Sequence, residues 1–241
     1  MNAGRTARDR ARAELTHEIK AAARRQLATE GAERLSLRAI SRELGMVSSA
    51  LYRYFPSRDD LLTALIIDAY DALGATAEAA AQESENDYPW DPLATWTAVC
   101  SAVRDWARAN PHEYALIYGS PVTGYKAPQT TVEPASRVPI VLLGLLSRAH
   151  AEGWLSPLRS APEVDGVLAD QVDVLAELAP GVPRKTLLRV GIAWTQLFGM
   201  ISFELFGQLV GTMDPADEFF AAATRQMAEF IGLRRLAAVG E

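Results

Sequence analysis

The stretch GMVSSALYRYFPSRDDLL, residues 45–62, is the most informative part of the sequence. It brings together a glycine, two adjacent serines, three aromatic side chains and two arginines, and then continues with Pro-Ser, two aspartates and two leucines. A helix that only filled a core would have no use for a pair of serines followed by Tyr-Arg-Tyr. We therefore expect this stretch to contact something outside its own core.

The residues around Gly45 predict two short helices joined by a tight turn. Ser36 is a typical helix N-cap, and Ser41 is small enough to let two helices approach closely. Gly45 can take the positive φ that such a turn demands. Pro56 ends the second helix, and Ser57 caps the one that follows. Apolar residues spaced to bury a shared core lie at Ile40, Leu44, Val47 and Leu51.

The second of these helices has two different faces. Its inner face carries Leu51 and Phe55, whereas its outer face carries Ser48, Ser49, Tyr52 and Arg53. Short serines allow a close approach to a surface, and tyrosine and arginine donate hydrogen bonds to phosphates or base edges. The pattern predicts a helix-turn-helix whose second helix enters the major groove of DNA.

The distribution of charge agrees with that interpretation. The formal net charge of the 241 residues is −6, which argues against indiscriminate coating of nucleic acid. Residues 1–58, however, hold 12 basic and 6 acidic side chains, whereas residues 59–241 hold 12 and 24. A basic head on an acidic body indicates that the head meets an anion.

The remainder of the chain is predicted to be helical, so the fold class is all-α. A three-helix DNA-binding domain with a basic N-terminal arm is expected over residues 1–58, and a larger helical ligand-binding and dimerisation domain over 59–241. The polar run QESENDYPWDP, residues 82–92, is expected to bend the chain. Helical patterns then cover about 92–109, 111–118, 133–153, 163–178, 184–210 and 215–235.

A cytoplasmic, soluble protein is expected. The single cysteine, Cys100, excludes an internal disulfide, and the basic N-terminus lacks the apolar run of a signal peptide. Residues 190–213 are apolar enough to resemble a membrane span, but Glu204 near their centre would cost about 2.5–3.5 kcal/mol on insertion. A helix buried in a bundle or between two subunits explains this segment better than a membrane span.

Residues 36–62, with the amphipathic helix before them, resemble the N-terminal domain of TetR-family transcriptional regulators. The features that carry the resemblance are AISRELGMV, LYRYF and PSRDDLL. A second run, AWTQLFGMISFELFGQL at 193–209, is similar to the C-terminal helix of a TetR subgroup with a Trp-x-x-x-His-Gly signature, although Phe198 stands where that signature has histidine.

The resemblance implies a set of DNA contacts. Helix residues Ser48, Ser49, Tyr52, Arg53 and Tyr54 would read the groove, Arg58 would hold a phosphate, and Ser36 and Arg38 would touch the backbone. The arginines at 5, 8, 10 and 12 are expected to form either a disordered arm that adds non-specific affinity or a solvated tail. Two copies are expected to pair through helices 184–210 and 215–235 and to read a near-palindromic operator.

The body is rich in aromatic residues, most of which are expected to be core. Those chosen as contacts for a small apolar or aromatic effector are Trp96, Tyr118, Trp194 and Phe198. Glu204 is expected to be either a satisfied structural carboxylate or a partner of the ligand or second subunit.

Two other functions remain open on the sequence alone. One is an enzyme with a vestigial DNA-binding head, although the sequence contains neither a phosphate-binding loop nor a nucleophile elbow. The other is a helical scaffold that binds only protein. Glu14-x-x-His17 is a single copy in the basic first helix, so we predict no metal site, and we predict no cofactor. The sequence favours a homodimeric, ligand-responsive DNA-binding regulator, most simply a repressor.

Overall fold

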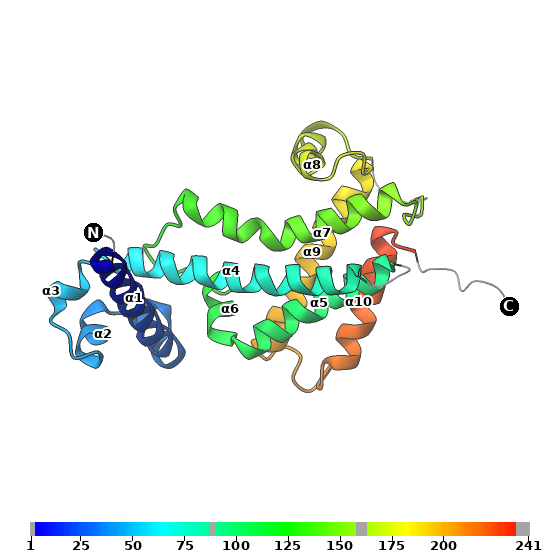
Figure 1. Ribbon diagram of the computed structural model, residues 1–241. Helices are drawn as coiled ribbons and strands as arrows, with labels where there is room; N and C mark the ends of the chain where they lie inside the picture. Colours follow the sequence, from blue (N-terminus) through cyan, green and yellow to red (C-terminus); the bar gives the residue numbers. More distant parts are fainter. Residues whose placement is uncertain (1–2, 87–89, 158–162, 235–241) are drawn as a thin grey trace. The chain divides into compact units, whose positions relative to one another are not determined.

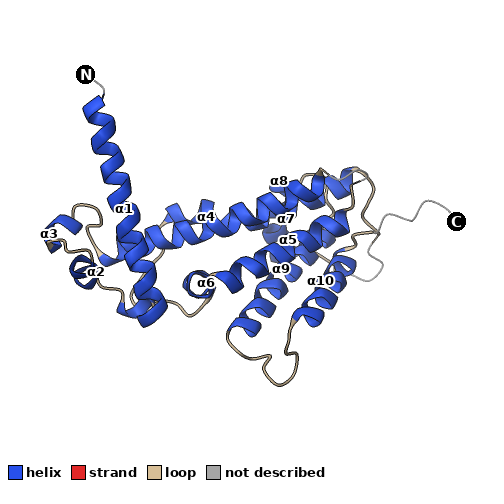
Figure 2. Cartoon of the chain, turned by 60° about the horizontal axis from the view of Figure 1, so that its bottom comes forward, coloured by secondary structure: helices blue, strands red, loops and turns tan. Residues whose placement is uncertain are grey.

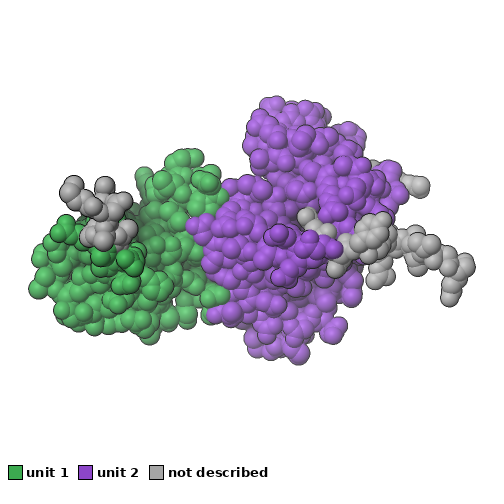
Figure 3. Space-filling view, viewed as in Figure 1, with its two compact units in different colours: residues 1–70, 110–134 green, residues 71–109, 135–241 purple. Residues whose placement is uncertain are grey.

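The computed structural model describes residues 3–86, 90–157 and 163–234. Within these ranges all regular structure is helical, apart from one isolated bridge between Leu155 and Leu233 (Figures 1 and 2). The all-α prediction is therefore confirmed. The chain packs as two compact units, unit 1 from residues 1–70 and 110–134, and unit 2 from residues 71–109 and 135–241 (Figure 3).

Unit 1 begins with the predicted helix-turn-helix. Its elements are α1 (Ala3–Glu30), the 3₁₀ turn η1 (Ala32–Arg34), α2 (Leu37–Glu43), α3 (Ser48–Leu51) and the first part of α4 (Arg58–Glu85). They close around one apolar cluster, whose buried members include Ile19, Leu27, Leu35, Ile40, Leu51, Phe55, Leu61 and Leu65. The inner face predicted for the second helix, Leu51 and Phe55, is thus confirmed.

The local signals in the sequence operate as expected in this unit. The Ser36 hydroxyl accepts a hydrogen bond from the Ala39 N–H, and the Ser57 hydroxyl accepts one from the Asp60 N–H. Gly45 has φ 64°, a conformation in the left-handed region that glycine adopts without strain. Together these three features fix where α2 begins, where α4 begins and how sharply the chain turns between α2 and α3.

The basic N-terminus differs from the expected arm. Residues 3–30 form one helix, α1, because this alanine- and arginine-rich run has high helix propensity throughout. The prediction of a disordered arm is therefore wrong. The guanidinium of Arg12 lies over the ring of Tyr54, with 5.5 Å between Cζ and the ring centroid, so this part of α1 packs on the turn that follows α3.

A segment from the middle of the chain completes unit 1. It contains α6 (Pro111–Tyr118) and η2 (Gln129–Thr131). Arg24 on α1 donates to the Glu113 carboxylate of α6 at 2.7 Å, and the hydroxyls of Thr63 and Tyr125 lie 2.9 Å apart. The compact units therefore divide the chain differently from the predicted domains. α4 begins at residue 58, where the domain boundary was expected, and the boundary between the compact units falls inside this helix, between residues 70 and 71.

Unit 2 contains the rest of α4 and the following helices: α5 (Pro92–Ala109), α7 (Val132–Ala151) from residue 135 onward, α8 (Gly166–Leu178), α9 (Arg184–Leu205) and α10 (Asp217–Ile231). Helices 92–109 and 111–118 have the bounds that were predicted, because each begins at a proline, which suits the first helical turn. The predicted helix 184–210 is shorter than expected and ends at Leu205, before a run of turns.

One described helix, α9, is long and apolar enough by length and composition to cross a membrane, although only part of it is buried in unit 2. The one carboxylate of α9, that of Glu204, is paired with an arginine. The Glu204 oxygens accept two hydrogen bonds from the Arg104 guanidinium of α5, both at 2.7 Å. The Arg104 side chain is only 8% exposed and also pairs with Asp217 at 2.8 Å. Hydrogen bonding to Glu204, above all, raises the pKa of Arg104.

The Arg104–Glu204 pair is a satisfied structural pair, so its disruption should destabilise unit 2. We expect Glu204→Ala to lower the free energy of unfolding by about 3 kcal/mol, because a largely buried guanidinium then loses its bidentate partner. The control Glu152→Ala breaks the exposed pair with Arg148, 2.9 Å apart, and should cost less than about 1 kcal/mol. Urea denaturation measures both, and equal losses would contradict the structural role of Glu204.

Cys100 provides a second check on this core. Its side chain is fully buried in α5, and burial raises the pKa of the thiol far above its ordinary value. Because the thiolate is the reactive form, the folded protein should not react with Ellman's reagent at pH 8. Denaturant should release one reactive thiol per chain. Rapid reaction in the absence of denaturant would contradict the packing around α5.

Candidate nucleic-acid interface and ligand cavity

The turn between α2 and α3 is held by side-chain as well as backbone hydrogen bonds. The hydroxyls of Ser41 and Ser48 lie 3.0 Å apart, and the Met46 N–H donates to the Ser41 carbonyl at 2.8 Å. Ser41 is 1% exposed, which is possible because its hydroxyl also donates to the Arg38 carbonyl. The prediction that a small residue at 41 permits close approach agrees with this geometry.

The exposed side of α3 carries most of the residues predicted to read DNA. Ser49 lies in α3, and Tyr52 and Arg53 lie in the turn that continues it, where their N–H groups still bond back to the carbonyls of residues 48 and 50; all three side chains are exposed. Tyr54 is half-buried beneath Arg12. Ser48 is half-buried as well and is bonded to Ser41. Ser48 therefore connects α3 to α2 and leaves Ser49, Tyr52 and Arg53 as the exposed set.

Val47 was predicted to belong to the shared core, and that prediction is wrong. It is the N-cap residue of α3 and is 69% exposed, with extended backbone at φ −69° and ψ 135°. The left-handed Gly45 turns Met46 rather than Val47 toward the interior, where Met46 is half-buried. Val47 is consequently a further residue of this surface. A branched apolar side chain beside serines is suited to contact the methyl group of thymine.

Exposed basic side chains also lie on α2, which packs against α3. Arg38 and Arg42 are four residues apart on one face of α2, and both are exposed. Arg42 was missed, although its i, i+4 spacing from Arg38 could have identified it. Other cations of unit 1 are paired with carboxylates: Arg25 pairs with Glu43 at 2.6 Å, and Lys20 pairs with Asp68 at 2.7 Å. We define the recognition surface as Arg38, Arg42, Val47, Ser49, Tyr52 and Arg53.

Two residues predicted to touch the DNA backbone have internal roles. Arg58 donates to the carbonyl oxygens of Ala32 and Glu33 at 2.8 and 3.2 Å, so it links the start of α4 to η1. Ser36 caps α2, and its N–H donates to the Gln26 side chain at 3.0 Å. The Thr123 N–H donates to the Glu33 carboxylate at 2.8 Å and, as the main cause, lowers the pKa of Glu33.

The aromatic residues proposed as ligand contacts do not form one group. Trp96 is fully buried, and its Nε1 donates to the Thr224 carbonyl at 3.0 Å, which ties α5 to α10. Tyr118 belongs to unit 1 and packs with Tyr70 and Tyr114 at centroid distances of 6.0 and 5.2 Å. Burial raises the pKa of the Tyr118 hydroxyl.

Trp194 and Phe198, by contrast, lie together on α9. Their rings meet edge to face with centroids 6.0 Å apart. Trp194 also lines a cavity of about 430 Å³ between α7, α8 and α9, which we name the α7–α9 cavity. This volume lies in the range of small-molecule sites. Its other walls are mostly apolar and include Pro139, Leu142, Leu143, Leu175 and Val190.

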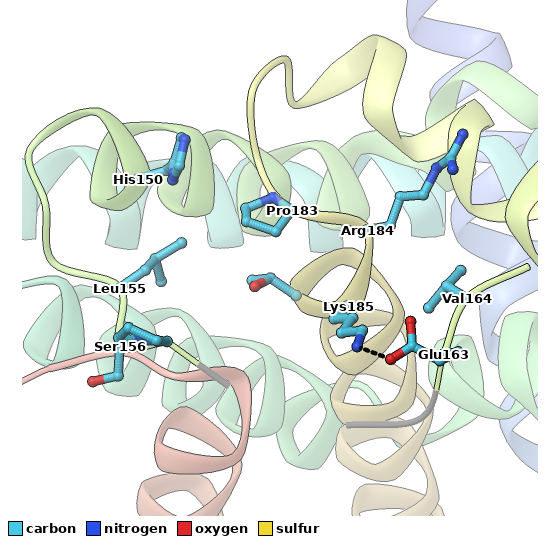
Figure 4. A pocket seen from close by; sticks show the side chains of 10 residues that line it. His150, Leu155, Ser156, Glu163, Val164, Pro183, Arg184 and Lys185 are labelled. Carbon is cyan, nitrogen blue, oxygen red and sulfur yellow. Dashed lines mark hydrogen bonds and ion pairs between the residues drawn. The ribbon is translucent and has the colours of Figure 1, made fainter. Parts of the chain in front are cut away.

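A second cavity, of about 570 Å³, lies where α7 ends and α9 begins (Figure 4). His150, Lys185 and Arg184 line it, but its cations already have partners. Lys185 pairs with Glu163 at 2.5 Å, as the dashed line in Figure 4 shows, and Arg184 pairs with Asp173 at 2.6 Å. The charges of this cavity are therefore largely neutralised from within the protein.

Comparison with known proteins identifies the family. The family described as bacterial regulatory proteins, tetR family, matches residues 19–65, and the tetracyclin repressor-like C-terminal domain matches residues 96–227. The chain belongs to the TetR family. The TetR match at 19–65 spans the helix-turn-helix and the start of α4, and the second match covers more than half of the chain.

Individual TetR relatives agree with this assignment. The chain is 40% identical over 217 residues to the HTH-type transcriptional regulators Rv1816 of Mycobacterium tuberculosis and Mb1846 of Mycobacterium bovis, covering 88% of this chain and 90% of each relative. The crystal structure of the regulatory protein SCO4313 matches with TM-score 0.71 and 33% identity over 92% of this chain and 98% of that one. A Rhodococcus sp. RHA1 protein of unknown function matches with TM-score 0.67 and 25% identity, covering 92% and 96%.

The TetR assignment makes this chain a DNA-binding transcriptional regulator, and it argues against the enzyme interpretation, because the curated relatives are named as regulators. TetR-family regulators are soluble DNA-binding proteins. The apolar character of α9 accordingly needs an explanation other than a membrane.

Arg53 and Arg58 were both predicted to contact DNA, Arg53 in the groove and Arg58 at a phosphate, but their surroundings differ. We expect Arg53→Ala to weaken DNA binding by about 1–3 kcal/mol with an unchanged melting temperature, because Arg53 is exposed on the recognition surface. Arg58→Ala should lower the melting temperature as well, because it removes the bonds to residues 32 and 33. Fluorescence anisotropy on the duplex upstream of the gene, combined with thermal melting, measures both effects.

The control for this pair is Arg184→Ala, which removes an exposed arginine of unit 2. It should leave DNA affinity unchanged. The assignment of roles is contradicted if Arg53→Ala lowers the melting temperature, or if Arg58→Ala leaves it at the parent value.

Proposed function

We propose that this TetR-family regulator is a homodimeric repressor that leaves a palindromic operator when a small apolar ligand binds unit 2. The observation that carries the proposal is the recognition surface, an exposed set of hydrogen-bonding and apolar side chains on a rigidly held helix pair. Ser49, Tyr52 and Arg53 would read base edges in the major groove, and Arg38 and Arg42 would contact phosphates.

The small size of one recognition surface supports a homodimer. α3 together with its following turn presents few side chains, which is too little for a specific operator. Two such surfaces about 34–36 Å apart would meet successive major grooves on one side of the duplex. The operator would then be an inverted repeat, because the two-fold symmetry of the protein is matched by the DNA.

Exposed apolar side chains on α9 and α10 support these two helices as the dimer interface. Ile192, Phe203 and Phe206 are 45%, 55% and 46% exposed and lie along one stripe of the helix and its end. On α10, Phe230 is 37% exposed. Such apolar side chains on a soluble protein mark an interaction surface. Pairing of these helices between copies would cover the stripe and explain the apolar composition of α9.

The path of the chain supports coupling between the ligand and DNA. After α5 the chain leaves unit 2, forms α6 and η2 in unit 1, and returns to unit 2 at residue 135. Within unit 1, α6 is bonded to α1 through Arg24 and Glu113, and Tyr125 is bonded to Thr63 of α4. A ligand that favours one arrangement of α5 and α7 would therefore bias the position of α6 and, with it, the spacing of the recognition surfaces.

The dimer can be tested separately from DNA. We expect Phe203→Asp to shift the protein from dimer to monomer in light scattering, because a charge would be buried without a partner in the helix pairing. Operator affinity should fall at the same time. The control Val132→Asp changes a side chain of similar exposure, 52% against 55%, and should leave the dimer intact.

If Phe203→Asp remains a dimer at micromolar concentration, the α9 surface is not the interface. If it is monomeric and still binds the operator with the parent affinity, the proposal that specific binding needs two copies is wrong.

A further inference from the structure

Trp194, which lines the α7–α9 cavity, carries a buried donor without a partner. Among the described residues, the buried side-chain atoms that lack a hydrogen-bond partner are Trp194 Nε1 and Ser147 Oγ. Trp194 lines the cavity, and its ring is held against Phe198 by an edge-to-face contact. A buried N–H without an acceptor is costly, and native proteins rarely keep one, so this donor calls for an explanation.

A glycine forms part of the cavity wall. Gly191 lies in the interior of α9 and lines the cavity. A Cβ added at this position would meet no atom within 4 Å, so close packing does not require glycine there. Glycine in a helix interior destabilises the helix relative to alanine. Alanine at position 191 would therefore make the helix more stable, but its side chain would enter the cavity, and the protein has glycine there.

The chemistry of the walls limits the occupant. The side chains that line the cavity are uncharged. The one hydroxyl among them, that of Thr195, already donates to the Ile192 carbonyl at 2.8 Å. An ionised group placed here would lose its hydration without gaining a counter-charge. Trp194 Nε1 can only donate, so the group that satisfies it must be an acceptor.

We propose that the α7–α9 cavity binds an uncharged, largely apolar molecule whose hydrogen-bond acceptor is held by Trp194 Nε1. A ketone, ester, lactone or ether oxygen on an aliphatic or aromatic skeleton has this chemistry. The inference rests on the proposed function, in which a ligand in unit 2 controls DNA binding. It assigns the site and the chemical class of that ligand.

Three matched probes test the proposal by direct binding to the full-length protein. They are 4-phenylbutan-2-one, butylbenzene, in which a methylene replaces the carbonyl, and 3-phenylpropanoate, in which an anionic oxygen replaces the methyl group. Each is titrated against the uncharged fluorescent dye N-phenyl-1-naphthylamine, and its dissociation constant is obtained from displacement. We expect 4-phenylbutan-2-one to bind more tightly than 3-phenylpropanoate, because the cavity offers no cation.

Trp194→Phe isolates the hydrogen bond, because it removes the N–H and keeps an aromatic ring. It should weaken 4-phenylbutan-2-one relative to butylbenzene by roughly 2- to 10-fold, the range for one hydrogen bond. Trp154→Phe is the control, because the Nε1 of Trp154 donates to the exposed Glu152. It should leave the ratio of the two dissociation constants unchanged.

Gly191→Leu tests the location, because the leucine side chain would fill the cavity. It should abolish displacement by all three probes while preserving the helical circular dichroism signal. Gly144→Leu is the matched control, a glycine in the interior of α7 that is exposed and meets no atom within 4 Å of an added Cβ. It should bind the probes as the parent does.

The proposal is overturned if 3-phenylpropanoate binds best, if Trp194→Phe leaves the ketone-to-hydrocarbon ratio unchanged, or if Gly191→Leu still binds. Anisotropy on operator DNA, measured separately, distinguishes this failure from failure of the proposed function. DNA binding without probe binding overturns only the site. Probe binding that leaves operator affinity unchanged upholds the site and contradicts ligand-controlled repression.

Discussion

The 3.0 Å contact between the hydroxyls of Ser41 and Ser48 is the constraint on which the proposed recognition surface depends. It holds α3 close to α2, and the left-handed Gly45 makes so short a connection possible. With the inner side of α3 fixed by Leu51, the side chains of Ser49, Tyr52 and Arg53 project from a backbone that has little freedom to move. Side chains that recognise bases need a rigid backbone, because hydrogen bonds to base edges weaken when the donor is displaced by a fraction of an ångström.

The helix-turn-helix could be predicted because its signals are local. Ser36, Gly45 and Ser57 each act on backbone groups within a few residues, and the structure uses all three as expected. Val47 was misassigned for a related reason. Apolar spacing alone placed it inside, but the φ of Gly45 sets the direction of the next residues, and that angle cannot be obtained from spacing. The prediction of a disordered N-terminal arm was wrong because it rested on the positive charge of the arginines and neglected the high helix propensity of an alanine-rich run.

The parts that the sequence could not reveal are long-range. Arg104 and Glu204 are 100 residues apart, so the pairing partner of Glu204 was not visible in any local pattern. The same holds for residues 110–134, whose membership of unit 1 depends on Arg24 and Thr63 far earlier in the chain. Trp96, Tyr118 and Trp194 looked equivalent as aromatic residues, but their hydrogen bonds and neighbours separate them into a core tryptophan, a tyrosine cluster and a cavity wall.

The central claim is that two copies of the recognition surface read one inverted repeat. Selection of bound duplexes from a random-sequence library by the purified full-length protein tests it most directly, because no operator has to be assumed. The account predicts enrichment of a sequence with two-fold symmetry whose half-sites are centred about one helical turn or a small multiple of it apart. The selected duplex should bind about a thousandfold or more tightly than a scrambled one. Enrichment of a single unpaired half-site, or of no sequence above the starting library, would contradict the account.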